Sequence, residues 1–143
     1  MTVTPSPVLE LGVRMASPLA VMVGIYLLFA GHNNPGGGFA AGLVFGTVVT
    51  LRTVAGLSAP ERWLDLVAGG VIVVGLVALA PMLFGSELLD QVVVETELPV
   101  LGKVKSGSAL IFDIGVTAIV VGLVAALLDA LWDTAPSTNE ASP

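Results

Sequence analysis

Residues 107–132 read GSALIFDIGVTAIVVGLVAALLDALW, and this stretch decides the fold class. It carries only two charged side chains, Asp113 near its beginning and Asp129 near its end. About 20 consecutive apolar residues are enough for a helix to cross the roughly 30 Å hydrocarbon core of a bilayer. The stretch is long enough, and it therefore predicts a membrane-spanning helix that holds one carboxylate within its length.

Three more apolar segments precede this one, at about residues 8–31, 38–57 and 63–84. The second is interrupted by Arg52, whose long side chain can reach the headgroup layer. Of the 143 residues, 55% are hydrophobic and 11% are charged, and the mean hydropathy is +0.99. Soluble domains carry about 25% charged residues. The sequence therefore predicts an all-α membrane protein with about four transmembrane helices in one domain, residues 8–132, because helices satisfy their own backbone groups in lipid.

Polar segments surround this domain. We expect residues 1–7 to form a flexible N-terminal lead. Residues 133–143 are rich in Pro, Ser, Thr and Asn, and we expect them to form a disordered C-terminal tail. The connection at 86–106, between the third and fourth helices, is the longest and is acidic. Within it, the β-branched run 92–94 beside Thr96 predicts a short strand or hairpin.

The distribution of arginine and lysine predicts the orientation. An even number of spans places both termini on one side of the membrane together with Arg14, Arg52 and Arg62, while Lys103 and Lys105 lie on the other side. Cytoplasmic loops carry the excess of basic residues. We therefore expect a multi-pass membrane protein with cytoplasmic termini and an extracytoplasmic acidic loop.

Composition also excludes several functions. The chain has no cysteine and a single histidine, which rules out thiolate metal sites, cysteine nucleophiles and disulfides. The formal net charge is −6, and no basic patch of the kind that binds nucleic acid is present. We find no pattern typical of an enzyme active site, predict no cofactor, and expect lipid rather than nucleic acid around the chain.

The most specific local pattern is GHNNPGGGF at residues 31–39. Proline and clustered glycines end helices and form tight turns. Beyond the turn, glycines recur every four residues, which places them on one helix face that another helix can approach closely. The structural interpretation is a turn plus a packing groove; the alternative is a polar cavity or ion path lined by loosened backbone. The residues concerned are Pro35, Gly36, Gly37, Gly38, Phe39, Gly42 and Gly46.

Two titratable residues are candidates for an ion path. Asp113 is a functional candidate because a charged carboxylate facing lipid is costly, although a structural hydrogen bond is the alternative. His32 could carry protons near neutral pH, although a hydrogen-bonding role in the turn is the commoner outcome. Arg52 and Asp65 lie on either side of the second turn and could form an ion pair that holds two helices together.

Two of these motifs resemble those of a known family. The run 31–39 and the segment FDIGV at 112–116 resemble the two signatures of the MnhB family, the B subunit of Mrp-type multisubunit cation/proton antiporters. The similarity extends over about residues 8–132. Ala40 and Ala41 depart from it, because family members often carry a polar residue there, so no polar contribution is expected from these positions.

The resemblance implies a small subunit of a large complex in the bacterial plasma membrane. Such a complex exchanges cytoplasmic Na⁺ for external H⁺, and its proton channels reside in large subunits related to those of respiratory complex I. This chain would assemble with those and with other small subunits, and would itself be non-catalytic. The resemblance points to Pro35, Gly36, Gly37, Gly38, Phe39 and Asp113 as positions that matter for assembly or for the cation path.

Two other functions stay open on the sequence alone. One is the equivalent subunit of a membrane-bound hydrogenase or of another complex I-like oxidoreductase that translocates ions. The other is a small transporter that assembles with copies of itself. A transporter needs ion and proton sites near the bilayer midplane, and Asp113 stands alone among the predicted helices in that respect. The scarcity of such groups favours a subunit over a complete transporter.

Overall fold

The computed structural model describes five ranges, residues 6–31, 36–58, 62–83, 93–98 and 102–133. These ranges contain four helices and two strands, in the order α1 (Pro7–Ala30), α2 (Gly38–Val54), α3 (Trp63–Leu83), β1 (Val93–Leu98), β2 (Gly102–Gly107) and α4 (Ser108–Asp133). Most of the predicted lead and most of the predicted tail lie outside the described residues, as do His32 and Pro35.

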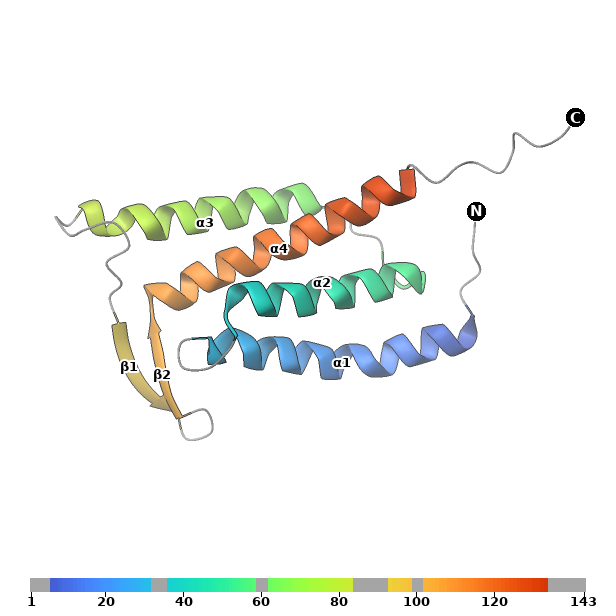
Figure 1. Cartoon of the computed structure of the whole chain (residues 1–143), viewed down its shortest axis with the longest axis horizontal. Helices are drawn as coiled ribbons and strands as arrows, with labels where there is room; N and C mark the ends of the chain where they lie inside the picture. Colours follow the sequence, from blue (N-terminus) through green and yellow to red (C-terminus); the bar gives the residue numbers. More distant parts are fainter. Residues whose placement is uncertain (1–5, 32–35, 59–61, 84–92, 99–101, 134–143) are drawn as a thin grey trace, which may run out of the picture.

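The four helices form a single layer in the order α1, α2, α4, α3 (Figure 1). α4 therefore packs between α2 and α3, and α2 packs between α1 and α4. α2 and α4 run in one direction, while α1 and α3 run in the other. α1 begins and α4 ends at one end of the layer, which we call the terminal end. The antiparallel hairpin of β1 and β2 extends from the opposite end, the hairpin end.

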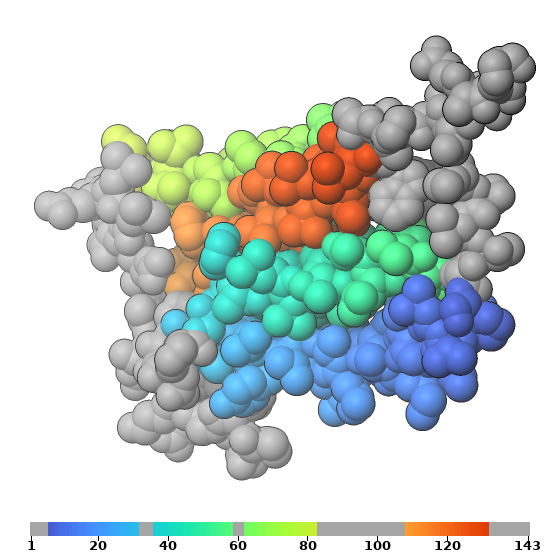
Figure 2. All heavy atoms as spheres, turned by 45° about the vertical axis from the view of Figure 1, so that its right-hand side comes forward, coloured from blue at the N-terminus to red at the C-terminus, as the bar shows by residue number. Residues whose placement is uncertain are grey.

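The surface of this layer is apolar. Large hydrophobic side chains are exposed on every helix, among them Leu19 at 66%, Leu76 at 65% and Leu131 at 66%. Figure 2 shows the helices as adjoining bands, so that each band presents its own side chains outward on this face. The buried hydrophobic residues of the described helices are alanines and valines, such as Ala41 and Val120. Because soluble proteins rarely expose a large continuous apolar surface, lipid or partner helices must cover this one.

Three of the helices, α1, α3 and α4, have the length and composition needed to cross a membrane. α2 is apolar but has only 17 residues, which is about 25 Å of helix and the lower end of spanning lengths. It nevertheless lies alongside α1 and α4 in the layer (Figure 1). The prediction of a helical, multi-pass membrane protein is confirmed, with the β-hairpin added at one end.

α2 ends at Val54, three residues before the predicted end, because a Schellman motif closes it. The backbone N–H groups of Gly56 and Leu57 donate to the carbonyls of Thr53 and Arg52 over 2.9 and 2.8 Å. Gly56 has a φ of 69°, a left-handed conformation that glycine adopts without steric cost. This glycine therefore turns the chain toward α3 instead of extending the helix.

Glycines also let α3 and α4 approach closely. A Cβ at Gly70 would lie 2.6 Å from the carbonyl oxygen of Gly115, and a Cβ at Gly122 would lie 2.9 Å from the carbonyl oxygen of Trp63. At the terminal end the indole N–H of Trp63 donates to the carboxylate of Asp129 over 3.2 Å. Close backbone contact and one polar bond thus join these two antiparallel helices.

The two strands of the hairpin pair over their whole length before the chain enters α4. In their register Glu95 pairs with Lys105 and Glu97 pairs with Lys103. The hairpin occupies the acidic segment in which the sequence predicts a strand or hairpin, and β2 leads without a break into Ser108, the first residue of α4.

Candidate functional site

The glycine-rich turn joins α1 to α2 at the hairpin end. The backbone N–H of Gly37 donates to the carbonyl of Leu27 over 2.9 Å, which satisfies one of the carbonyls left open in the last turn of a helix. Gly37 has a φ of 95°, and residues with a side chain rarely adopt this conformation. A Cβ on Gly31 would overlap the backbone of Gly37, and one on Gly36 would lie 2.7 Å from the Leu27 carbonyl oxygen. Glycine is therefore required for the chain to fold back onto α1.

Three buried glycines of α2 form its contact with α4, Gly38, Gly42 and Gly46. A Cβ at Gly38 would overlap the carbonyl oxygen of Asp113. At Gly42 it would lie 2.7 Å from Cβ of Val120, and at Gly46 it would lie 2.9 Å from Cγ2 of Val124. The groove left by the missing side chains is thus filled by one ridge of α4, and the two helices touch backbone to side chain along half their length.

A threonine hydroxyl ties the same two helices together. Oγ1 of Thr117 lies 3.0 Å from the carbonyl oxygen of Gly38 and 2.8 Å from the carbonyl oxygen of Asp113. A hydroxyl has one hydrogen to donate, so it is shared between a carbonyl of α2 and a carbonyl of its own helix. The bond to Gly38 crosses the helix interface, and it forms because no side chain at that position holds the helices apart.

Replacing Thr117 by valine keeps the shape of the side chain and removes the hydroxyl. We expect this variant to lose about 1 kcal/mol of stability, because hydrogen bonds between membrane helices are worth about 0.6–1.7 kcal/mol. Denaturant unfolding of the full chain in detergent measures the loss. Thr47→Val is the matched control, since the exposed Thr47 hydroxyl bonds only to the carbonyl of Leu43 in its own helix, over 2.8 Å. Equal destabilisation of both variants would contradict an interhelical role for Thr117.

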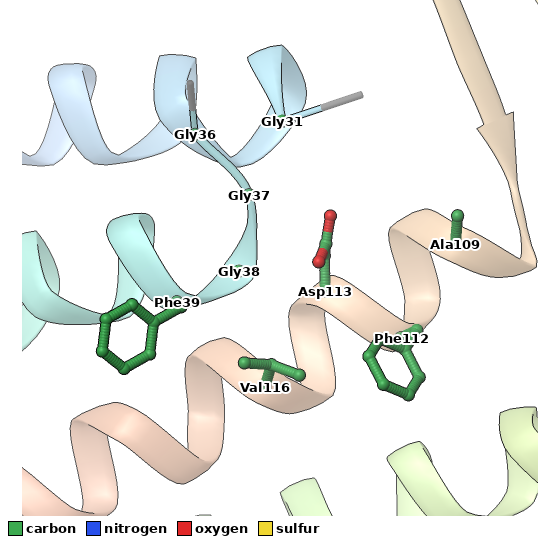
Figure 3. Close-up of a pocket in the computed structure, with 9 residues that line it drawn as sticks. All are labelled: Gly31, Gly36, Gly37, Gly38, Phe39, Ala109, Phe112, Asp113 and Val116. Carbon is green, nitrogen blue, oxygen red and sulfur yellow. The ribbon is translucent and has the colours of Figure 1, made fainter. Parts of the chain in front are cut away.

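A hollow of about 360 Å³ lies between the glycine turn and the beginning of α4. Asp113 is the sixth residue of α4 and is partly buried. Figure 3 shows its carboxylate pointing away from the axis of α4 and toward Gly37. Its two oxygens lie 3.7 and 3.8 Å from the position that a Cβ on Gly37 would take. The residues that line the hollow are Gly31, Gly36, Gly37, Gly38, Phe39, Ala109, Phe112, Asp113 and Val116.

The structure brings together two motifs that are far apart in the sequence. The glycines of the turn and Asp113 of the last helix face one another across the hollow (Figure 3). Phe39 lies at the edge of the hollow, with 62% of its surface exposed. His32 and Pro35, also predicted to contribute, lie outside the described residues. The hollow therefore combines loosened backbone with one carboxylate, an arrangement able to attract a cation but lacking a nucleophile and base for covalent chemistry among the residues described.

The expected ion pair between Arg52 and Asp65 is replaced by a local one. Nε of Arg62 donates to Oδ2 of Asp65 over 2.6 Å, at the beginning of α3. In the described part of the chain no ion pair joins Arg52 to Asp65. Arg62 lies three residues from Asp65, so this pair forms whatever the packing of α2 against its neighbours. A pair between Arg52 and Asp65 would require the ends of two helices to meet. Both side chains of the observed pair are more than half exposed, and such pairs contribute about 0–1 kcal/mol.

Sequence reasoning missed the residues of α4 that meet α2. These residues are Thr117, Val120 and Val124. Together with Asp113 they follow the spacing of four, three and four that marks one face of a helix, so the signal was present. The small residues Gly115 and Gly122, by contrast, face α3. α4 therefore uses one face for α3 and another for α2 and the hollow.

These features define a class of protein, a small multi-pass membrane protein whose helices pack through glycines into a layer and hold one carboxylate at a hollow between two helices. A protein family described as "Domain related to MnhB subunit of Na+/H+ antiporter" matches residues 8–126. The chain belongs to this MnhB family.

Relatives in Staphylococcus aureus are similar over most of their length. Proteins of the strains Newman and COL, both described as antiporter subunit mnhB2, are 34% identical to this chain over 128 residues. These matches cover 82% of this chain and 91% of each relative. The similarity therefore includes the glycine-rich turn and at least the greater part of the four helices.

The layer is also similar to part of a solved structure. The Mrp complex from Dietzia sp. DQ12-45-1b contains a chain that matches with a TM-score of 0.75 and 28% identity over 94% of this chain. This chain spans only 14% of the length of the Dietzia chain that it matches. In that complex the same layer thus forms a segment of a much longer polypeptide.

Proposed function

We propose that this chain is a small subunit of a multisubunit Na⁺/H⁺ antiporter of the Mrp type in a bacterial plasma membrane. The observation that carries the proposal is the family match over residues 8–126. The antiporter subunits of Staphylococcus aureus and the segment of the Dietzia Mrp complex support the same role. Its partners would be the other subunits of the complex, including the large complex I-like subunits that conduct protons. The names of these relatives favour an antiporter over a hydrogenase.

The role within the complex is assembly, with one polar contribution to the cation path. Of the charged residues in the four described helices, all except Asp113 lie toward the terminal end. A complete exchanger needs separate sites for ion and proton near the bilayer midplane. A layer with a single carboxylate at its hollow therefore supports transport by larger subunits and does not run the exchange, or any enzymatic reaction, alone.

The orientation that we propose places the terminal end in the cytoplasm. Arg14, Arg52 and Arg62 gather at this end, whereas Lys103 and Lys105 belong to the hairpin. Cytoplasmic segments of membrane proteins carry the excess of arginine and lysine. The hairpin and the hollow beside Asp113 would accordingly face the outside of the cell, from which the protons of an Na⁺/H⁺ exchange are drawn.

Copurification of the tagged full chain in mild detergent tests the proposed function. We expect the other antiporter subunits to accompany the chain, because the exposed apolar surface of the layer needs partner helices as well as lipid. Vesicles that contain only this chain should show no Na⁺/H⁺ exchange, while vesicles with the whole complex provide the positive control. Exchange by the isolated chain would support a self-assembling transporter instead, and hydrogenase subunits as companions would overturn the antiporter assignment.

A further inference from the structure

We propose that the hollow beside Asp113 is a vestibule that binds a hydrated monovalent cation from the hairpin side and is closed toward the terminal end. The choice of Na⁺ as that cation rests on the proposed antiporter function. The one-sided access does not rest on it, because it follows from how α2 and α4 pack.

The charge of the hollow selects a cation. Among the described residues that line it, Asp113 has the one ionisable side chain, and the rest are glycines, an alanine and apolar side chains. The carboxylate points into the hollow, and both of its oxygens lie beside Gly37, the residue before α2 (Figure 3). A cleft lined by charge of one sign concentrates ions of the opposite sign. The charge of Asp113 therefore favours a cation over an anion in the hollow.

The size of the hollow favours an ion that keeps its water. One water molecule occupies about 30 Å³ of liquid, so a hollow of about 360 Å³ holds a small cation with much of its hydration shell. A dehydrated divalent ion would need several oxygen ligands at short distances. Within the described ranges no three His, Asp or Glu side chains come together to supply them. A monovalent cation that keeps its water fits the single carboxylate of the described lining.

The contact between α2 and α4 closes the floor of the hollow. Directly beneath Asp113, the Thr117 hydroxyl bonds to the carbonyl of Gly38 over 3.0 Å. The next contacts toward the terminal end are Gly42 against Val120 and then Gly46 against Val124, each too tight for an added methyl group. Val120 is only 8% exposed. The seam between α2 and α4 therefore leaves no space for water beneath the hollow.

Cysteine labelling tests this vestibule, because the chain has no cysteine of its own. Val116→Cys places a thiol of similar size at the hollow, and Val120→Cys places one a helical turn deeper, beneath the floor. Lys103→Cys in the hairpin marks the side of the membrane. In membranes that contain the full chain with its partners, we expect impermeant thiol reagents to modify the Val116→Cys variant only from the side that labels the hairpin, and to leave the deeper variant unmodified from both sides.

The charge of the reagent tests the carboxylate. Steering by a charged cleft changes association rates by about 10-fold or more, so a cationic reagent should modify Val116→Cys about tenfold faster than an anionic reagent of the same size. Adding Asp113→Asn to Val116→Cys should remove this preference. A preference that survives the loss of the carboxylate would overturn the assignment of Asp113. Ala109→Cys, also at the hollow, gives a second position in case Val116→Cys reduces the amount of protein in the membrane.

The occupant is tested by competition. Sodium, compared with choline at constant pH and ionic strength, should slow the cationic reagent at Val116→Cys, whereas an unchanged rate would overturn a sodium-binding vestibule. Labelling from the terminal side, or labelling of Val120→Cys, would overturn the one-sided access. Labelling requires no transport, so these results are independent of whether the chain copurifies with antiporter subunits. Failure of the vestibule and failure of the proposed function are thereby distinguished.

Discussion

We expect Gly42→Leu to separate α2 from α4 and to remove most of the assembled complex. A Cβ at this position would lie 2.7 Å from Cβ of Val120 and 3.3 Å from Cα of Thr117. Leucine adds three further carbons to a site that has no room for the first. The Thr117 Cα belongs to the backbone, which cannot move aside by a change of rotamer. Overpacking a filled site costs about 1–3 kcal/mol or more, and membrane helices associate mainly by close packing.

Two measurements read out this prediction. Native gels of detergent-solubilised membranes report how much of the chain is in the complex, and unfolding of the isolated chain reports the stability of the layer. Gly75→Leu on α3 is the matched control for stability, because a Cβ at Gly75 would meet no atom within 4 Å. Leucine is also a better helix former than glycine, which is about 0.8–1.0 kcal/mol less favourable than alanine in a helix, so this control should be at least as stable as the unchanged chain. Intact complex with Gly42→Leu would count against the groove.

The face that α2 uses for packing could be predicted from the sequence, but its partner could not. The recurrence of Gly38, Gly42 and Gly46 every four residues is a property of one helix and needs no knowledge of the others. Which helix fills the groove depends on the order of the layer. Consecutive elements are usually adjacent in space, and α2 and α3 are an exception, because α4 lies between them. No local sequence pattern predicts that α4 packs between α2 and α3.

Local competition explains the predictions that differed from the structure. The sequence placed Asp65 opposite Arg52 across a turn, yet Arg62, three residues away, is the partner of Asp65 at 2.6 Å. The predicted second helix continued past Val54, yet Gly56 closes it with a left-handed residue and two hydrogen bonds. In the first case a residue three positions away, instead of one on another helix, forms the ion pair. In the second case a glycine in the connection ends the helix early. The end of α2 and the beginning of α3 are thus set by local turn geometry and by a short-range ion pair.

The hollow was predictable in its parts and not as a whole. An intramembrane carboxylate at Asp113 and a glycine-rich turn at 31–39 are both legible in the sequence. Their meeting depends on α2 and α4 running in the same direction, so that both begin at the hairpin end (Figure 1). That shared direction follows from the alternation of the four helices, because each helix begins at the end of the layer where the preceding one stops; the contact itself requires that α4 lie beside α2. The chemistry of the site is thus a product of topology as well as of motifs.

Asp113→Asn should lower Na⁺/H⁺ exchange about tenfold or more while leaving the subunit in its complex. A unit charge 4 Å away attracts a cation by about 4 kcal/mol at an effective dielectric constant of about 20, and losing even 1.4 kcal/mol of this lowers occupancy about tenfold. Asparagine has nearly the same volume and keeps one carbonyl oxygen. The bond from Thr117 goes to the backbone carbonyl of Asp113, so it survives the change. The loss should therefore appear in transport by vesicles and not in assembly.

Asp129→Asn is the control that tests whether the effect of Asp113→Asn depends on the position of the carboxylate at the hollow. It makes the same chemical change on the same helix, but Asp129 is exposed at the terminal end, where it accepts the indole N–H of Trp63 over 3.2 Å, a bond that an amide oxygen can also accept. We expect vesicles with this variant to exchange ions at close to the normal rate. If Asp113→Asn vesicles also exchange normally, the carboxylate has no part in the cation path. If instead Asp113→Asn removes the subunit from the complex, the carboxylate serves packing, and the hollow is a feature of the turn alone.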